Sequence, residues 1–413
     1  MRRPLTTPIA SLLVAGLLLT GCSSSGDDTA DAATSDRSGE ASGEPIRIGF
    51  EGPLSGNLAF IGSNQLAGLE ASIEWINDHG GVDGRPIEVL SEDDAGDSAK
   101  AVAAVRSLAG KDVVAIMANP VSSTLEALVP VAEASGVTLI SAGSSEQLLV
   151  PTNEWFYGLD IPPAAESTTQ VEFAAELLGD TDVDLALIGA DTPATEEWAN
   201  YVSSIAEDQG SEITGVQKVP VAAADVTAQS QAVIAGEPDA ILANLPEAGL
   251  ALVATRVREL GYDGPVINYH GGGAPSFLEE QNDPELYVAR TTAALTDDTD
   301  GKPGLQQFID ATEAAGTTSN AENNLLYGIG YLAGLVIKSA LESAGGDISA
   351  AAVNAALASF ELDTEGFTFG PVTYSDDDHQ GLDAEVFYHW KDGELAQALE
   401  GTSFVGTLPI AGR

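Results

Sequence analysis

Few residues in this chain could support thiol, imidazole or basic-surface chemistry. Its 413 residues include one cysteine and four histidines, and 16 lysines and arginines stand against 63 aspartates and glutamates, which gives a formal net charge of −47. Such an excess of carboxylates repels phosphates and anionic lipid headgroups, so we expect no nucleic-acid partner. A single cysteine also excludes a disulfide framework within the chain.

Catalytic motifs are equally scarce. The histidines, at 79, 270, 379 and 389, have no partner at a metal-ligand spacing such as H-x-x-x-H, and no G-x-S-x-G nucleophile elbow occurs. We therefore predict no enzyme activity, no metal and no cofactor, and we expect most of the histidines to be surface or packing residues.

The amino terminus is what an exported protein would carry. Arg2 and Arg3 precede an uncharged apolar stretch over 9–19, which is too short for a permanent membrane span and is typical of a secretory signal. The stretch ends in Leu-Thr-Gly-Cys at 19–22, which resembles the lipobox of bacterial lipoproteins. We expect a signal peptide over 1–21 and a lipidated Cys22 that anchors the protein to the outside of the cell membrane. The alternative is an ordinary signal with an accidental cysteine.

A polar segment follows the cysteine. Residues 22–44 are mostly Ser, Gly, Asp, Thr and Ala, which cannot bury enough surface to order themselves, so we predict a disordered tether. The remaining chain of about 370 residues exceeds what one hydrophobic core usually serves. Two lobes are therefore expected.

Short β-branched runs alternate with helical Ala/Leu/Glu segments along most of this body, in two successive series. The predicted strands are 46–52, 86–93, 113–119 and 137–143, then 184–191, 213–219, 239–245 and 265–269. Strands alternating with helices form parallel sheets covered on both faces. The sequence therefore predicts an α/β fold with two doubly wound parallel-sheet lobes.

Two further stretches set the lobe boundaries. Pro162 and Pro163 interrupt regular structure in 155–167, which we interpret as a crossover between the lobes. The apolar segment 323–343 is a core helix rather than a membrane span because Lys338 and Glu342 interrupt it, and strands at 367–375 and 384–390 follow. The predicted amino-terminal lobe is 46–161 plus 296–370, and the carboxyl-terminal lobe is 162–295 plus 371–405, with a multi-stranded hinge between them.

Ligands of open α/β sheets bind beyond the carboxyl ends of the strands. The loops 52–63, 119–124 and 142–147 follow three predicted strands and offer glycine, hydroxyl groups and helix starts that suit a carboxylate or another polar group. Ser122 taken alone would more simply be a helix N-cap. Three such loops at one sheet edge favour a pocket.

A His-Gly-Gly-Gly run at 270–273 permits two interpretations. It could supply backbone N–H donors to an oxyanion, as in esterases, or it could be a glycine bend where backbone approaches a solute. Because the nucleophile elbow is missing, we prefer the bend, with His270 as a hydrogen-bonding wall of the pocket. Asp93 and Asp94 are adjacent on a strand end and point to opposite faces, so we expect a turn or cap there rather than paired catalytic acids.

The order of segments resembles a known family. PLSGNLAFIG at 53–62, GLEASIEWINDHGGVDGRPIEVLSEDDAGDSAKAV at 68–102 and the VSST and SAGSS loops look like the type I periplasmic solute-binding proteins of the branched-chain amino acid and amide uptake class. The similarity extends over everything after the tether and is strongest over 46–148. It implies an extracytoplasmic, monomeric protein that binds a small-molecule solute between two lobes by hinge closure and passes it to an ABC permease in the membrane.

The resemblance also implies a set of binding residues. The first lobe would hold a carboxylate with hydroxyls and backbone amides, and an aromatic residue would cover the ligand; the second lobe would use the loops after its own strands. The resulting ligand-binding set is Phe60, Ser122, Ser123, Gly143, Ser144, Ser145, Asp191, Thr192, Asn244, His270 and Gly271.

The second lobe departs from the family pattern. In the family an acidic residue receives the α-ammonium group of the solute. The matching position in this chain falls in Tyr269-His270-Gly271, which contains no acid, although Asp191 could substitute. A buried cation without a partner is unfavourable by several kcal/mol, so an amide, a urea-like solute, a carboxylate without an amine or a polyol fits better than a plain amino acid. A ligand-sensing lipoprotein for a membrane receptor and an esterase remain as alternative functions.

Overall fold

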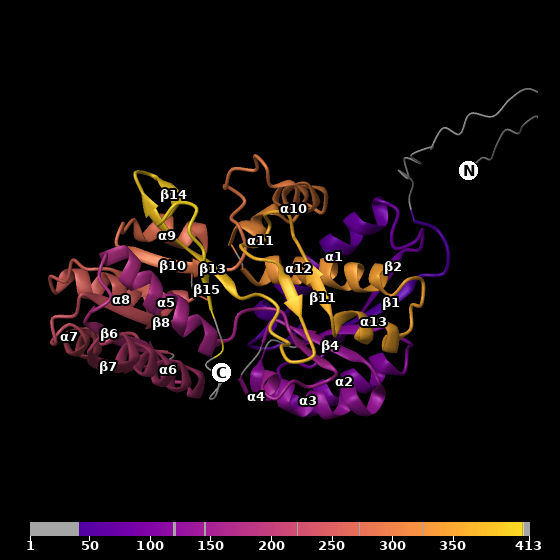
Figure 1. The fold of residues 1–413 in the computed structure, drawn as a ribbon, viewed down its shortest axis with the longest axis horizontal. Helices are drawn as coiled ribbons and strands as arrows, with labels where there is room; N and C mark the ends of the chain where they lie inside the picture. Colours follow the sequence, from indigo (N-terminus) through magenta and orange to yellow (C-terminus); the bar gives the residue numbers. More distant parts are fainter. Residues whose placement is uncertain are drawn as a thin grey trace, which may run out of the picture. The chain divides into compact units, whose positions relative to one another are not determined.

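Two parallel sheets, each with helices on both faces, organise the chain (Figure 1). The computed structural model describes residues 41–118, 121–143, 146–220, 222–271, 273–323, 325–406 and 408, without the side chains of residues 122, 123, 146 and 323. All of these residues belong to one compact unit, Ser38–Arg413. The signal, the tether up to residue 40 and the lipidation residue Cys22 lie outside the described residues.

The first sheet has the strand order β2-β1-β3-β4-β5 and is parallel throughout. Its strands are β1 (Ile46–Gly52), β2 (Ile87–Asp93), β3 (Ala115–Ala118), β4 (Thr138–Ser141) and β5 (Phe156–Gly158). The helices that follow its strands are α1 (Ala59–Asp78), α2 (Ser98–Ala109), α3 (Ser122–Ser135) and α4 (Glu146–Leu149). Late elements return to this sheet: α10 (Pro303–Ala314), α11 (Thr318–Asn323), α12 (Leu325–Ser343), α13 (Ala350–Leu357) and the hairpin of β11 (Phe360–Leu362) and β12 (Val372–Tyr374).

Both faces of the first sheet are buried. Ile48 and Phe50 of β1 pack with α1, α10 and α12 in one core cluster, whereas Ile116 and Leu139 of β3 and β4 pack with α2 and α3 in another. Sheets covered on both faces have strands that are nearly continuously apolar, which explains why these strands could be predicted from their sequence.

The second sheet repeats the order of the first. Counted from its own first strand, β7-β6-β8-β9-β10 has the same arrangement, and antiparallel β13 and β14 extend it. Its strands are β6 (Leu185–Ala190), β7 (Ile213–Val219), β8 (Ala240–Asn244), β9 (Val266–Asn268), β10 (Leu286–Arg290), β13 (Ala384–Lys391), β14 (Glu394–Gln397) and β15 (Phe404–Val405). Its helices are α5 (Pro163–Leu178), α6 (Pro193–Gln209), α7 (Thr227–Val233), α8 (Glu247–Glu259) and α9 (Pro275–Gln281). The predicted fold class is confirmed.

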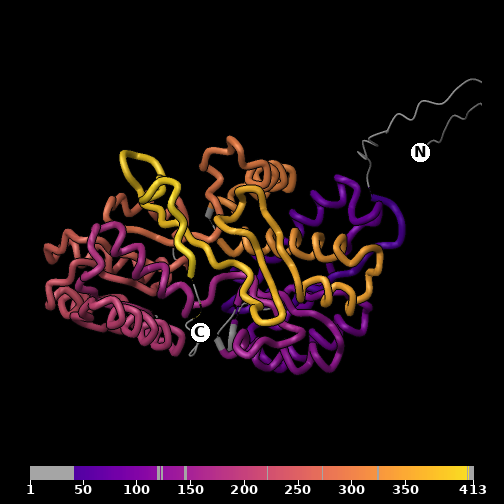
Figure 2. Tube along the Cα trace, viewed as in Figure 1, coloured from indigo at the N-terminus to yellow at the C-terminus, as the bar shows by residue number. Residues whose placement is uncertain are grey.

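Segments from distant parts of the sequence lie side by side where the chain passes between the sheets (Figure 2). Gly158, at the end of β5, forms a bridge with Gln380, and Thr292, after β10, forms a bridge with Thr368. The chain thus crosses at three places, near 159–162, 291–302 and 375–383, which makes a multi-stranded connection. The lobe boundaries proposed above stay predictions.

Three sequence predictions differ from the structure here. Residues 155–167 were expected to be irregular, but they contain β5 and the start of α5, which begins with Pro163 in its first turn, where proline is tolerated. The strand expected over 367–375 is limited to β12. Strand β10 was not predicted at all.

Helix α12 is the core helix that the sequence predicts. Within the described residues it is the one helix long and apolar enough to cross a membrane, but 67% of its apolar window is buried inside the protein. Its glycines explain how it packs: a Cβ on Gly330 would lie 2.0 Å from the backbone oxygen of Gln65, and one on Gly68 would lie 2.0 Å from that of Tyr327. The backbones of α1 and α12 are therefore in direct contact.

Candidate functional site

Loops at the carboxyl ends of the first sheet hold one half of the predicted binding residues. Phe60 is the second residue of α1 and is 67% exposed, and the buried Gly143 donates its backbone N–H to the Ser141 hydroxyl at 3.0 Å. Ser122 and Ser123 open α3, and the N-cap position belongs to Val121, so the N-cap interpretation of Ser122 is wrong by one residue. The side chains of Ser122 and Ser123 are outside the described part, as are residues Ser144 and Ser145 entirely.

The loops after β6 and β8 bring two predicted residues together through a third. Thr192 is the N-cap of α6, and its hydroxyl lies 3.1 Å from the hydroxyl of Thr195. The Thr195 hydroxyl in turn donates to Oδ1 of Asn244 at 3.4 Å. Asp191 is exposed beside them. This small network places hydroxyl and amide groups at the carboxyl ends of adjacent strands.

The loop after β9 carries the His-Gly-Gly-Gly run. Its backbone is fixed at both ends, because the His270 N–H donates to Oε1 of Glu166 at 2.7 Å and the Ala274 N–H donates to Oε1 of Glu247 at 2.8 Å. Gly271 is exposed, and Gly272 lies outside the described residues. The His270 N–H already serves a carboxylate, so this one donor of the run is not available to an oxyanion.

The His270 imidazole lies among three carboxyl groups, from the crossover, α5 and β13. Its Nδ1 is 2.9 Å from Oε1 of Glu166 and 3.7 Å from Oε1 of Glu385, and its Nε2 is 3.3 Å from Oδ2 of Asp160. The two glutamate side chains are fully buried, and 16% of the imidazole is exposed. We call His270, Asp160, Glu166 and Glu385 the His270 cluster.

Charges within this cluster shift its protonation equilibria. Burial by itself would lower the pKa of His270, but the neighbouring charges of Glu166 and Asp160 outweigh it and raise that pKa well above its usual value. Burial, followed by repulsion from Glu166, raises the pKa of Glu385 well above its ordinary range. These directions favour a protonated imidazole at His270 and a protonated carboxyl group at Glu385.

Hydrogen bonds to Thr169 agree with this protonation state. Its hydroxyl lies 2.8 Å from the carbonyl oxygen of Glu166 and 2.5 Å from Oε2 of Glu385. One hydroxyl hydrogen cannot serve both acceptors, so a proton on Glu385 completes the second bond.

The other three histidines are packing or surface residues, as predicted. His79 is exposed and stacks on Trp75 with ring centroids 4.1 Å apart. His379 and His389 are buried, and their Nδ1 atoms lie 2.8 Å and 2.7 Å from backbone carbonyl oxygens. Asp93 accepts backbone N–H groups from Leu54, Ser55 and Ala95, which confirms the expected strand-end turn.

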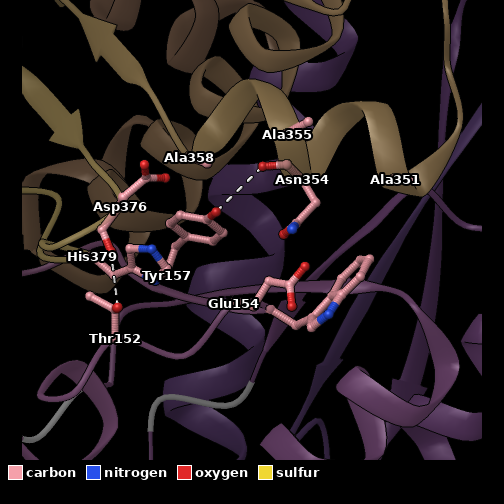
Figure 3. A pocket seen from close by; sticks show the side chains of 10 residues that line it. Thr152, Glu154, Tyr157, Ala351, Asn354, Ala355, Ala358, Asp376 and His379 are labelled. Carbon is pink, nitrogen blue, oxygen red and sulfur yellow. Dashed lines mark hydrogen bonds between the residues drawn. The ribbon is translucent and has the colours of Figure 1, made fainter.

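A separate cavity of about 470 Å³ lies elsewhere on the first sheet. Tyr157 points toward Asn354 of α13, donates to its carbonyl oxygen at 3.4 Å, and stacks on His379 with ring centroids 4.2 Å apart (Figure 3). Trp155 and Asp376 also line the cavity. Trp155 directly precedes β5, so the cavity is at the amino end of that strand, at the sheet edge opposite the predicted binding loops.

Sequence reasoning missed four residues at the site: Asp160, Glu166, Glu385 and Thr195. Glu166 is in the first turn of α5, where acidic residues are common because they interact favourably with the helix dipole. Its position therefore gave no sign of a functional role. Glu385 is a single acid in an otherwise apolar stretch of β13, and nothing beside it in the sequence indicates a partner. The one available signal was Asp160, a lone acid between a strand and a Pro-Pro pair. The structure thus supplies carboxylates that the β9 loop lacks.

Comparison with known proteins places this geometry among solute-binding proteins. A family model described as periplasmic binding protein matches residues 45–394. Leu/Ile/Val-binding protein homolog 7 of Brucella suis biovar 1 is 26% identical over 385 residues, covering 88% of this chain and 94% of the relative. The leucine-, isoleucine-, valine-, threonine-, and alanine-binding protein of Pseudomonas aeruginosa is 32% identical over 102 residues, covering 25% of this chain and 27% of the relative.

Solved structures share the fold over nearly their whole length. An ABC transporter substrate-binding protein from Sphaerobacter thermophilus matches with a TM-score of 0.76 at 22% identity, covering 88% of this chain and 98% of that chain. A branched-chain amino acid transporter substrate binding protein from Streptococcus pneumoniae, solved in complex with isoleucine, matches with a TM-score of 0.68 at 20% identity, covering 88% and 99%. At these identities the likeness shows the fold alone.

Proposed function

This chain belongs to the periplasmic binding protein family, and from that premise we propose that it is the extracytoplasmic substrate-binding lipoprotein of an ABC importer. It would capture a small polar solute between loops of its two sheets and release it chemically unaltered to the permease. Cys22 would carry the lipid anchor, and the tether would end at residue 40, because Ala41 and Ser42 already donate backbone N–H groups to the folded body.

The observation that carries the proposal is the placement of polar groups on two sheets of the same strand order. Gly143 follows β4 of the first sheet, Thr192 follows β6 of the second, and Asn244 is the last residue of β8. In open α/β sheets this edge is where ligands bind. Hinge closure would bring the two sets of loops onto one solute, which would stabilise the closed form.

The His270 cluster bears on the class of solute. A solute amine buried without a negative partner would be unfavourable, and the β9 loop itself offers no carboxylate. Asp160 and Glu166 supply negative charge beside His270. We therefore retain amino acids in the proposed solute class, together with amides, urea-like solutes and small carboxylates.

A thermal-shift screen of the purified protein tests the proposal. Each solute should be offered as a matched set: an α-amino acid, its amide, and the same carboxylate without the amine. A ligand at about one hundred times its Kd stabilises the folded protein by about 2.7 kcal/mol, which raises the melting temperature measurably. Steady hydrolysis of an ester or amide, with no stabilising solute, would contradict the proposal.

Variants then test the location of the site. Ser145→Ala and Asn244→Ala should each weaken binding of the identified solute, because each removes a hydrogen-bonding group. Ser107→Ala, on the exposed face of α2, is the matched control and should leave affinity unchanged. If both site variants bind as tightly as the control, the site is elsewhere.

A further inference from the structure

We propose that the His270 cluster is a binding site for one divalent transition-metal ion, with Zn²⁺ as the best-suited ion. Nδ1 of His270 and one carboxylate oxygen each of Glu166 and Glu385 would be the ligands. These three ligand atoms lie within 4.8 Å of one another. The site uses Glu166 and His270, which the proposed function places near the solute, but its test uses the metal alone and does not depend on transport.

The distances among the ligand atoms suit a small tetrahedral ion. Zn²⁺ binds histidine nitrogen and carboxylate oxygen at about 2.0–2.2 Å, so two ligand atoms of a tetrahedron are about 3.4 Å apart. The distances from Nδ1 to the glutamate oxygens, 2.9 Å and 3.7 Å, lie on either side of that value. The two glutamate oxygens, which lie within 4.8 Å of each other, would have to approach the same ion, and water could occupy the fourth position.

Unpaired carboxylate oxygens point to a missing cation. Among the described residues, Oε1 of Glu385 and Oε2 of Glu166 are buried and have no hydrogen-bond partner. A buried polar atom left without a partner costs about 1–3 kcal/mol, and more when it is charged. A divalent ion bound by Oε1 of Glu385 would give that oxygen a partner, would displace a proton from this carboxyl group, and would add positive charge beside Glu166.

The surroundings are already arranged as supports for metal ligands. A histidine that binds a metal usually donates its other ring N–H to a carboxylate, and Asp160 lies 3.3 Å from Nε2 of His270. Thr169 holds Oε2 of Glu385, which leaves Oε1 facing Nδ1, and the His270 N–H fixes Oε1 of Glu166. Both glutamates are therefore oriented by neighbours before any ion binds.

The ligand types select the kind of ion, and the exposed edge of His270 gives it a way in. One imidazole and two carboxylates favour Zn²⁺ and neighbouring first-row ions over Ca²⁺ and Mg²⁺, which prefer six or more oxygen ligands. The 16% exposure of the imidazole, next to the exposed Gly271, opens the site to solvent on one side.

Metal titration of the exported protein, first stripped with a chelator, tests the site. With Zn²⁺ we expect one ion per chain by equilibrium dialysis and a rise in melting temperature, and with Co²⁺ we expect the visible absorption of a tetrahedral site. Mg²⁺ and Ca²⁺ at the same concentrations should give neither effect. Failure to bind one Zn²⁺ per chain would overturn the proposal and leave the cluster as an internal ion pair.

Substitutions separate this site from adventitious binding to the acidic surface. Glu385→Gln keeps the shape of the side chain but removes a ligand, and Asp160→Asn weakens the support of the imidazole, which typically lowers metal affinity by about tenfold to a hundredfold. His79→Gln removes an exposed histidine outside the cluster and is the control. Zinc binding of unchanged affinity in Glu385→Gln would overturn the proposal, and so would its loss in His79→Gln.

Folding of the variants is checked without metal. The metal-free melting temperature and the far-UV circular dichroism of Glu385→Gln should match those of the parent protein within a few degrees. If Glu385→Gln does not fold, Asp160→Asn tests the site instead. An unchanged zinc affinity and an unchanged Co²⁺ spectrum in Asp160→Asn would contradict the proposal.

Discussion

Replacing Gly330 with alanine should force α1 and α12 apart. The two helices touch through their backbones, and the added methyl group would begin 2.0 Å from the backbone oxygen of Gln65. Because real Cβ contacts below 3.0 Å essentially do not occur, the helices must separate by about 1 Å at this point. Neither contacting group is a flexible side chain, so the strain cannot be relieved by a change of rotamer.

The expected loss in the free energy of unfolding is the difference between an unfavourable packing effect and a favourable helix-propensity effect. Overpacking a core costs about 1–3 kcal/mol, and the fixed backbone on both sides favours the upper part of that range. Alanine in place of glycine inside a helix returns up to about 1 kcal/mol. We therefore expect Gly330→Ala to destabilise the protein by about 1–2 kcal/mol.

Urea denaturation followed by circular dichroism measures the effect, with Gly249→Ala as a matched control. Gly249 is in the first turns of α8, where a Cβ would meet only the Leu245 side chain at 3.4 Å, an ordinary contact. The control should be stabilised by about 0.5–1 kcal/mol. If Gly330→Ala is also stabilised, the backbones of α1 and α12 are not in direct contact, and α12 is not a close-packed core helix.

Three further predictions concern the binding residues, pH and the anchor. Thr195→Val removes the hydroxyl that donates to Asn244, and it should weaken solute binding severalfold, since one hydrogen bond is worth about 0.5–1.5 kcal/mol; unchanged affinity would show that this network does not support the site. Burial lowers the pKa of His379 in the folded protein below the pKa of the same residue in the unfolded chain. The unfolded state therefore binds more protons, and the stability that the neutral ring contributes is lost as pH falls below about 6.5. The melting-temperature difference between the parent and His379→Gln should therefore narrow as pH is lowered from 7.5 to 5.5, and a constant difference would contradict the shift. Cys22→Ser should move the protein from the membrane fraction to the soluble extracytoplasmic fraction, and retention at the membrane would contradict lipidation.

The succession of strands and helices could be predicted from the sequence because parallel strands that are buried on both faces are short, nearly continuous apolar runs. This signal located β1 and β7 at the residues where the structure has them, and most other predicted strands within two residues. It failed for β5, which has three residues shortly before a Pro-Pro pair, and for β10, which has five residues soon after the Asp-Pro pair at 283–284. Pairing with neighbouring strands, rather than local composition, makes these segments extended.

Prediction of the site was limited by distance along the chain. Thr192 and Asn244 could be placed because each lies at the carboxyl end of a predicted strand: Thr192 follows β6, and Asn244 is the last residue of β8. Glu166 and Glu385 are separated by 219 positions, and the residues beside each of them indicate no partner. Only the closure of β13 onto β10 and the packing of α5 bury them beside His270, so no local pattern could have revealed the cluster.

The contact between α1 and α12 also constrains the order in which this chain acquires structure. Roughly 250 residues separate the end of α1 from the start of α12, yet both cover the same face of the first sheet. A chain threaded through a translocation channel from its amino end would present the apolar surface of β1 and α1 to water until residue 325 has emerged. Closing so long a loop is slow, so chaperones of the exit compartment have a defined surface to shield during that interval.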